Sequence, residues 1–343
     1  MIDSLALVES PTQLLNALEW AHAAGQGRAR IVVLAPSDEH SLRQIAGVVA
    51  RASSLEVEID VAHVRRRNLS GVRALVRVAL AVRGAQRVVV GDPFSGMIQS
   101  LLPLSRVREL VVVDDGTATW EFADCIAAGR PLERWRVAGT GPSRGRRAAR
   151  ATRATRATQR FSPSTKCSLT VFSCLPSGAV PPGASLVTND YAWTRGTWAA
   201  SIDDTRTDII GTSLVDTGVV DRESYVGAVA NLASQLGALR YYAHRRESAD
   251  VLAEIRSLRD VEVIHSQLPI ELALTSGPVA RRLVTFPSTA AYTLPIVLAG
   301  SGVRIEVRRI EPSWFTPGTT EHARRFVTRI AEDAKLPDVA AIA

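Results

Sequence analysis

The sequence predicts an α/β protein with two domains, each built on a doubly wound parallel sheet. Short uninterrupted runs of valine, isoleucine and leucine alternate with segments of helical period along most of the chain. Continuous apolar runs are typical of strands that helices cover on both faces. The length of 343 residues exceeds what one ordinary hydrophobic core supports, which indicates two domains.

The first half of the chain contains five predicted strands. The first covers residues 5–8 and precedes Ser10-Pro11, an N-cap with proline at the first position of a helix over 12–23. The remaining strands are expected at 30–34, 57–61, 87–90 and 110–113, with helices near 41–51, 70–82 and 95–102. We expect residues 1–140 to form the first domain.

An arginine-rich segment interrupts this alternation. Seven arginines lie between residues 144 and 160, in a stretch that contains Arg-Ala-Thr three times in succession. The segment has too few large apolar residues to join a core. We expect residues 141–164 to form a linker or a mobile insertion. The alternative is a peripheral contact with phosphate-bearing lipid or polymer at the inner face of the membrane.

The second half resumes the alternation of strands and helices. Strands are expected at 168–172, 185–188, 208–210, 239–242, 261–264, 283–286 and 303–307, and helices at 222–236, 249–258, 271–276 and 289–298. An amphipathic helix is expected at about 321–334. We expect residues 165–317 to form the second domain and residues 318–343 to form a closing helix and tail.

Composition restricts the class of function. A net charge of +7 favours anionic partners such as phosphates, acidic glycans or a membrane surface. The three cysteines form neither a disulfide framework nor a zinc-binding spacing, so we expect no metal site. The sequence has no signal-peptide pattern at its start and no apolar run of about 18 residues, which predicts a cytoplasmic protein. It also has no Gly-x-Gly-x-x-Gly and no P-loop, which disfavours dinucleotide and NTPase functions.

Polar turns follow three predicted strands of the first domain. Asp114-Asp115-Gly116 follows the strand at 110–113, and one carboxylate of this pair could act as a general base. The alternative is an Asx turn that caps the next helix. Ser10 and Gln13 follow the first strand and Asp92 follows the fourth, where they either bind an acceptor or cap their helices.

Three further turns follow strands of the second domain. His244 and Arg245 follow the strand at 239–242, where ligands bind in open α/β sheets, although a solvated loop is the alternative. Ser288 and Thr289 open a helix, and hydroxyls at a helix N-terminus form an anion site as readily as a cap.

A carboxylate follows the strand at 261–264. Pro269-Ile270-Glu271 supplies a side chain suited to ribose hydroxyls, or a helix N-terminal acid. These turns make the carboxyl edges of both predicted sheets the candidate site.

In order and spacing, these motifs resemble those shared by bacterial sialyltransferases of the GT-B type. Asp114-Asp115-Gly116 is similar to their acidic-Asp-Gly motif, residues 241–247 to the His-Pro motif, and Pro287-Ser288-Thr289 to the Ser-Ser/Thr motif. The nearest groups are glycosyltransferase family 52 and the polysialyltransferases. Residues 10–15 and Gly211-Thr212-Ser213-Leu214 also look like this group's first turn and the start of its second domain. Arg245 departs from the pattern because the motif has proline there.

The resemblance covers most of the chain outside about 142–160 and implies a fold and a reaction. The implied fold is GT-B, with two Rossmann-like domains facing a central cleft and a C-terminal helix closing it. The implied reaction is inverting, metal-independent transfer of sialic acid or a related 2-keto acid sugar from its CMP conjugate to a glycan or glycolipid hydroxyl. No cofactor is implied, because the CMP-sugar is itself the donor substrate.

The resemblance also implies roles for individual residues. Asp115 would be the base for the incoming hydroxyl, and His244 would assist departure of the CMP phosphate. The implied nucleotide-binding residues are Gly211, Arg245, Pro269, Glu271, Ser288 and Thr289. The implied acceptor-binding residues are Ser10, Gln13, Asp92 and Asp114.

Three alternatives stay open at this stage. The donor could be CMP-Kdo or a nucleoside diphosphate sugar, and the chain could be a transferase that has kept the fold without the activity. A third alternative is a non-catalytic basic protein that binds an anionic polymer or a membrane. We expect no nucleic acid partner, because no aromatic residue interleaves with the arginines of 144–160 to provide a stacking surface.

Overall fold

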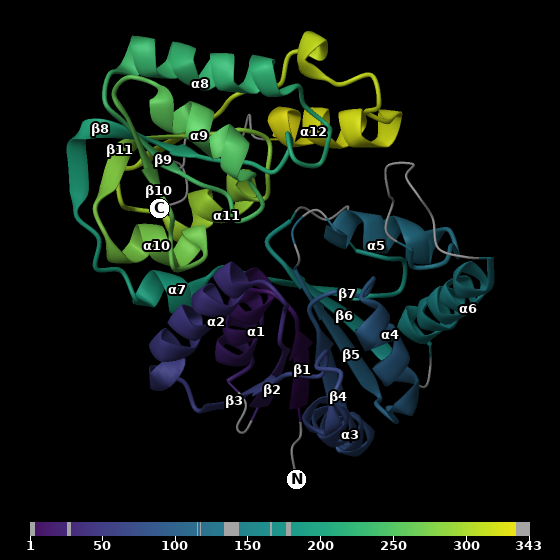
Figure 1. Ribbon diagram of the computed structural model, residues 1–343. Coiled ribbons are helices and arrows are strands. Elements are labelled where there is room, and N and C mark those ends of the chain that lie inside the picture. The colour runs from purple at the N-terminus through teal and green to yellow at the C-terminus, as the bar shows by residue number, and fades with distance from the viewer. Residues whose placement is uncertain are drawn as a thin grey trace. The chain divides into compact units, whose positions relative to one another are not determined.

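The computed structural model contains two compact units, Met1–Trp193 and Thr194–Ala343. It describes residues 4–25, 29–114, 116, 118–133, 144–164, 167–175 and 180–333 (Figure 1). Each unit has one parallel sheet with helices interleaved between its strands. The predicted class, α/β with two doubly wound sheets, is therefore confirmed.

The first sheet has seven strands in the order β3-β2-β1-β4-β5-β6-β7. Each neighbouring pair is parallel, as expected for strands joined by helical crossovers. The strands are β1 (Ser4–Val8), β2 (Ala29–Leu34), β3 (Val57–Ala62), β4 (Arg87–Val90), β5 (Glu109–Val113), β6 (Ser168–Ser173) and β7 (Ser185–Thr188).

Four helices of this unit begin at side-chain caps that the sequence supplies. Ser10, Asp38, Asn68 and Ser95 each accept a hydrogen bond from a backbone N–H in the first turn of the following helix. The helices are α1 (Pro11–Ala24), α2 (Glu39–Arg51), α3 (Leu69–Gly84), α4 (Gly96–Leu101), α5 (Ala118–Ala127), α6 (Arg144–Phe161) and, at the junction of the units, α7 (Ala192–Gly196).

The arginine-rich segment forms helix α6, so its prediction as a linker or mobile insertion was wrong. Ala154, Ala157, Thr158 and Phe161 are buried and lie on one face of the helix. Their core includes Phe122 of α5, whose ring meets that of Phe161 edge-on at a centroid distance of 5.4 Å. Small alanines let the helix approach closely, and one phenylalanine supplies the large apolar contact that composition alone did not reveal. Residues 141–143 of the predicted linker lie outside the described residues.

Strands β6 and β7 belong to the first sheet, which corrects the predicted domain boundary. β6 pairs with β5 from Glu109↔Ser168 to Val113↔Phe172, and β7 pairs with β6. The first unit therefore extends to Trp193, and the second starts at Thr194 instead of residue 165. An apolar run predicts a strand but does not specify its partner, because pairing depends on residues far away in the sequence.

The second sheet has five parallel strands in the order β10-β9-β8-β11-β12. They are β8 (Ile202–Ile210), β9 (Leu239–Tyr242), β10 (Val261–Ile264), β11 (Val279–Thr285) and β12 (Arg304–Val307). The helices are α8 (Arg222–Leu236), α9 (Ala249–Ser257), α10 (Ile270–Ser276), α11 (Ala290–Val297) and the C-terminal α12 (Glu321–Asp333). Of the described helices, none has both the length and the apolar character needed to cross a bilayer.

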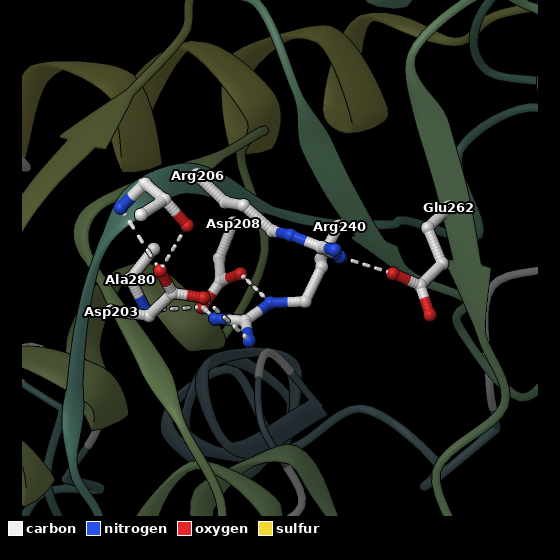
Figure 2. A network of polar contacts seen from close by, with 7 residues as sticks. Asp203, Arg206, Asp208, Arg240, Glu262 and Ala280 are labelled. Atoms are coloured by element: carbon white, nitrogen blue, oxygen red, sulfur yellow. Dashed lines mark hydrogen bonds and ion pairs between the residues drawn. The ribbon is translucent and has the colours of Figure 1, made fainter.

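A buried ion pair connects three strands of the second sheet (Figure 2). Arg240 of β9 donates to both carboxylate oxygens of Asp208 on β8, at 2.7 and 3.1 Å. The backbone N–H of Ala280 on β11 donates to the same carboxylate at 2.7 Å, and Asp203 lies 3.3 Å from Arg240. Burial raises the pKa of Asp208, while these hydrogen bonds oppose the rise. The pair thus joins β9, β8 and β11, whose ends carry the predicted nucleotide site.

Candidate functional site

Each sheet has a point where the strand order changes direction. In the second sheet this point lies between β8 and β11, and in the first between β1 and β4. Ligands of doubly wound sheets bind outside the carboxyl ends of the strands at such a switch point. The second sheet carries Gly211 after β8, His244 after β9, and Ser288 with Thr289 after β11. These four predicted residues therefore follow the three strands around one switch point.

The backbone at His244 is held by a buried carboxylate. Glu247 Oε2 accepts a hydrogen bond from His244 N at 2.6 Å. The N–H of Arg246 donates to His244 Nδ1 at 3.2 Å. A ring nitrogen that accepts a hydrogen bond carries no proton, so the proton of the neutral imidazole is on Nε2. His244 is thus a hydrogen-bond donor through Nε2.

Glu247 belongs to a buried chain of hydroxyl and carboxylate groups. The Tyr241 hydroxyl donates to Glu247 Oε1 and lies 2.7 Å from the Tyr225 hydroxyl. Burial raises the pKa of Glu247 to about 7, and the Tyr241 hydrogen bond opposes the rise. The sequence analysis included Glu247 only as the last residue of the segment 241–247. Its spacing of three residues after His244 is the local signal that could have indicated a side-chain contact with that backbone N–H.

Gly211 allows β8 to end directly against this turn. A Cβ at this position would lie 2.5 Å from Glu247 Oε2 and 2.9 Å from Tyr242 O. Its own N–H donates to Tyr242 O at 2.9 Å. A larger residue would push the His244 turn away from β8, so Gly211 has a packing role. Its predicted contact with nucleotide stays a prediction.

Ser288 and Thr289 lie at the start of α11 and are half-buried. Thr289 is the N-cap residue but its side chain makes no capping hydrogen bond. The Ser288 hydroxyl lies 3.5 Å from Thr285 Oγ1. The sequence alternatives were a cap and an anion site. The absence of side-chain capping by Thr289 in this described segment is compatible with the anion site.

Glu271 makes a contact inside the protein. It is buried in α10, two residues after Pro269, and its Oε1 accepts from Thr293 Oγ1 of α11 at 2.9 Å. This hydrogen bond connects α10 to α11. Binding of ribose hydroxyls by Pro269 and Glu271 stays a prediction, as does the contact of half-buried Arg245 with phosphate.

In the first unit, Asp114 holds the turn that follows β5. Its carboxylate is buried and accepts from Thr119 Oγ1 and Ser173 Oγ, both at 2.7 Å. Burial raises the pKa of Asp114, and these hydrogen bonds oppose the rise. The enclosed carboxylate thus ties β5 to β6 and α5. Asp115, the predicted base, lies outside the described residues.

Ser10, Gln13 and Asp92 make local hydrogen bonds at the switch point of the first sheet. Ser10 Oγ accepts from Gln13 N at 3.2 Å, which is the capping alternative. Gln13 Oε1 accepts from Glu9 N at 2.8 Å, and Asp92 Oδ1 accepts from Phe94 N at 2.9 Å. Binding of an acceptor by these three residues and Asp114 stays a prediction.

The described residues contain no group of three or more histidine, cysteine, aspartate or glutamate side chains placed to hold a metal ion. The predicted base Asp115 and the predicted leaving-group residue His244 belong to different units. Their action at one site stays a prediction, as does the cleft between the units.

Comparison with known proteins finds no matching family model and no matching curated protein. Among solved structures, the chain is similar to E. coli heptosyltransferase WaaC with ADP-2-deoxy-2-fluoro heptose, at 13% identity over 96% of this chain and 99% of that one, with a TM-score of 0.45. It is also similar to Phytolacca americana UGT2 complexed with UDP-2fluoro-glucose and pterostilbene, at 12% identity over 97% and 94% of the chains, with a TM-score of 0.43. The Acinetobacter baumannii MurG structure has 10% identity over 97% and 94%, with a TM-score of 0.38. These values do not assign the chain to a family.

Proposed function

We propose that this chain is a glycosyltransferase that binds a nucleotide-sugar donor at the carboxyl ends of β8, β9 and β11. The observation that supports this most is the convergence of the His244 and Ser288-Thr289 turns around the switch point of the second sheet. The ordered resemblance of the three sequence motifs to GT-B sialyltransferases supports the same reaction class.

The proposed chemistry needs charge stabilisation on the leaving side. The bond from the anomeric carbon to the donor phosphate breaks while the bond to the acceptor hydroxyl oxygen forms. The Nε2 proton of His244 would hydrogen-bond the departing phosphate, and the hydroxyls of Ser288 and Thr289 would hold its other oxygens. Glu247 acts on this step indirectly, because it holds the backbone of His244 in position.

The acceptor side needs a base. The acceptor hydroxyl proton would pass to Asp115. The acceptor oxygen would attack the anomeric carbon on the face opposite the leaving group, which inverts the configuration of that carbon. An oxocarbenium-like transition state needs no metal when protein donors stabilise the phosphate. The proposed donor is CMP-linked sialic acid or a related 2-keto acid sugar, on the resemblance alone. Arg245 favours a second candidate, a nucleoside diphosphate sugar, because a guanidinium in place of proline fits an additional phosphate.

The first test is nucleotide binding by the full chain. A ligand that binds only the folded protein raises the melting temperature. At a concentration of a hundred times its Kd, it adds about 2.7 kcal/mol to the free energy of unfolding. If the donor is a CMP-sugar, we expect CMP to raise the melting temperature more than UDP, ADP or GDP does. If the donor is a nucleoside diphosphate sugar, we expect one of these three diphosphates to raise it more than CMP does. If none of the four nucleotides shifts melting, the proposal is wrong.

The second test is release of nucleotide from the matching donor. His244→Ala should lower the rate by about 10²-fold, because an imidazole donor on the leaving group is lost. His22→Ala is the matched control, since His22 is exposed on α1 and should leave the rate within about twofold of the original. EDTA should not change the rate. Equal rates for the two variants would remove His244 from the mechanism.

A further inference from the structure

The outward face of α3 carries four apolar side chains that are largely exposed. Leu69 is 76% exposed, Val72 58%, Val76 52% and Leu80 63%. Their spacing of three, four and four residues places them along one side of the helix. Isolated exposed apolar residues are ordinary on protein surfaces, but a continuous row of this kind marks an interaction surface.

The opposite face of α3 already packs on the first sheet. Gly71, Ala74, Val78 and Val82 are buried, and the last three belong to the same core as the strands. The inward face therefore supplies the packing that holds α3 on the sheet. The four outward apolar side chains do not belong to this core. A helix that is apolar on both faces is normally covered on both. Figure 1 shows α3 at the outer edge of this unit.

The charged residues of α3 and of the turn just before it, residues 65–67, are all arginines. Arg73 and Arg77 are exposed beside the apolar row, and Arg66 and Arg67 are exposed just before the helix. α3 contains no acidic residue. None of these four arginines forms an ion pair with any residue that the structure describes. A symmetric contact with a second copy would bring the arginines of two such faces together, which is unfavourable.

We propose that α3 docks the chain on a lipid bilayer with anionic headgroups. The apolar row would enter the boundary between headgroups and acyl chains, and the flanking arginines would contact lipid phosphates. The arginine-rich helix α6 lacks this combination, because its described exposed positions are alanine, threonine, arginine and glutamine and include no large apolar residue. The inference uses only α3 and its surroundings, so it does not depend on the proposed function.

The test measures co-sedimentation of the full chain with lipid vesicles. One set of vesicles contains phosphatidylcholine alone, and the other contains equal parts of phosphatidylcholine and phosphatidylglycerol. We expect binding to the anionic vesicles, weak binding to the neutral ones, and release in high salt. Leu69→Ser/Val76→Ser/Leu80→Ser should abolish binding, and Arg73→Gln/Arg77→Gln should weaken it about fivefold per arginine, from about 1 kcal/mol each.

A charge-matched control separates docking by α3 from attraction by net charge. Arg156→Gln/Arg259→Gln removes the same charge from exposed positions on α6 and in the second unit and should leave binding within about twofold. Circular dichroism checks that every variant is folded. The proposal is overturned by absence of binding to anionic vesicles, by equal loss in the control, or by unchanged binding of the triple serine variant. It is also overturned if sedimentation velocity shows that the triple variant only dissociates a dimer.

Discussion

At the scale of single residues, Glu247 connects folding to the candidate chemistry. Its two oxygens accept from the Tyr241 hydroxyl and the His244 backbone, so one carboxylate determines where the His244 turn lies. The Glu247 side chain is buried, and this burial raises the pKa of its carboxyl group to about 7. Glu247 does not touch substrate in the proposed mechanism and is therefore a positioning residue.

This pKa predicts a pH-dependent stability. The folded protein binds the Glu247 proton more tightly than the unfolded chain, whose ordinary value is 4.5. Protonation of Glu247 therefore contributes about 3 kcal/mol to the free energy of unfolding. This contribution is fully present below about pH 4.5 and is lost as the pH rises through about 7. Glu247→Gln removes the titration. Urea unfolding should therefore show the stability of the original protein falling relative to this variant over that range.

A matched variant makes the pH experiment specific. Glu223 lies on the exposed side of α8, and Glu223→Gln removes the same kind of carboxylate as Glu247→Gln does. Its stability difference from the original protein should stay nearly constant over the same pH range. A constant difference for Glu247→Gln as well would show that the carboxylate is not protonated near neutral pH.

At the scale of elements, α6 shows how a polar-looking segment becomes part of a core. The Arg-Ala-Thr repeat places Ala154 and Ala157 on the face that Phe161 also occupies, and all three are buried. Thr158 adds a hydrogen bond from its hydroxyl to Arg130 O at 2.9 Å. The helix is thereby attached at its apolar face, while Arg156 stays in solvent.

The burial of Phe161 predicts a large loss of stability on truncation. Phe161→Ala should reduce the free energy of unfolding by about 3–5 kcal/mol, because it leaves a cavity against Phe122. Gln159→Ala on the exposed side of α6 should change it by less than about 0.5 kcal/mol. Urea unfolding measures both. A small effect of Phe161→Ala would mean that α6 is a detached linker.

At the scale of the whole molecule, each unit has a hydrophobic cluster of its own among the residues that the structure describes. One joins β1 to β6 with α3, α4, α5 and α6, and the other joins β8, β9 and β11 with α8, α9 and α12. Chains with more than one core commonly unfold in more than one step. The candidate nucleotide residues all belong to the second unit.

Calorimetry should therefore resolve two unfolding transitions. Phe161→Ala should lower the melting temperature of one, and a saturating nucleotide should raise the melting temperature of the other, since binding stabilises only the unit that holds the ligand. A single transition that responds to both changes would show that the two units unfold together.

Sequence patterns were sufficient for properties that depend on near neighbours in the chain. Apolar runs such as 110–113 and caps such as Ser10 identified strands and helix starts correctly, because backbone conformation responds to local composition and periodicity. The same patterns predicted parallel sheets and polar turns at the carboxyl ends of their strands. The α/β class was therefore determined by the sequence alone.

Only the tertiary structure decided which distant residues meet. It assigned β6 and β7 to the first sheet, buried one face of α6, and placed the carboxylate of Glu247 against β8 and the His244 turn. Each of these outcomes depends on packing and desolvation between segments that are far apart in the sequence. Local composition predicts neither the packing nor the desolvation. For the same reason the sequence determined that His244 follows a strand, while the structure determined what holds it there.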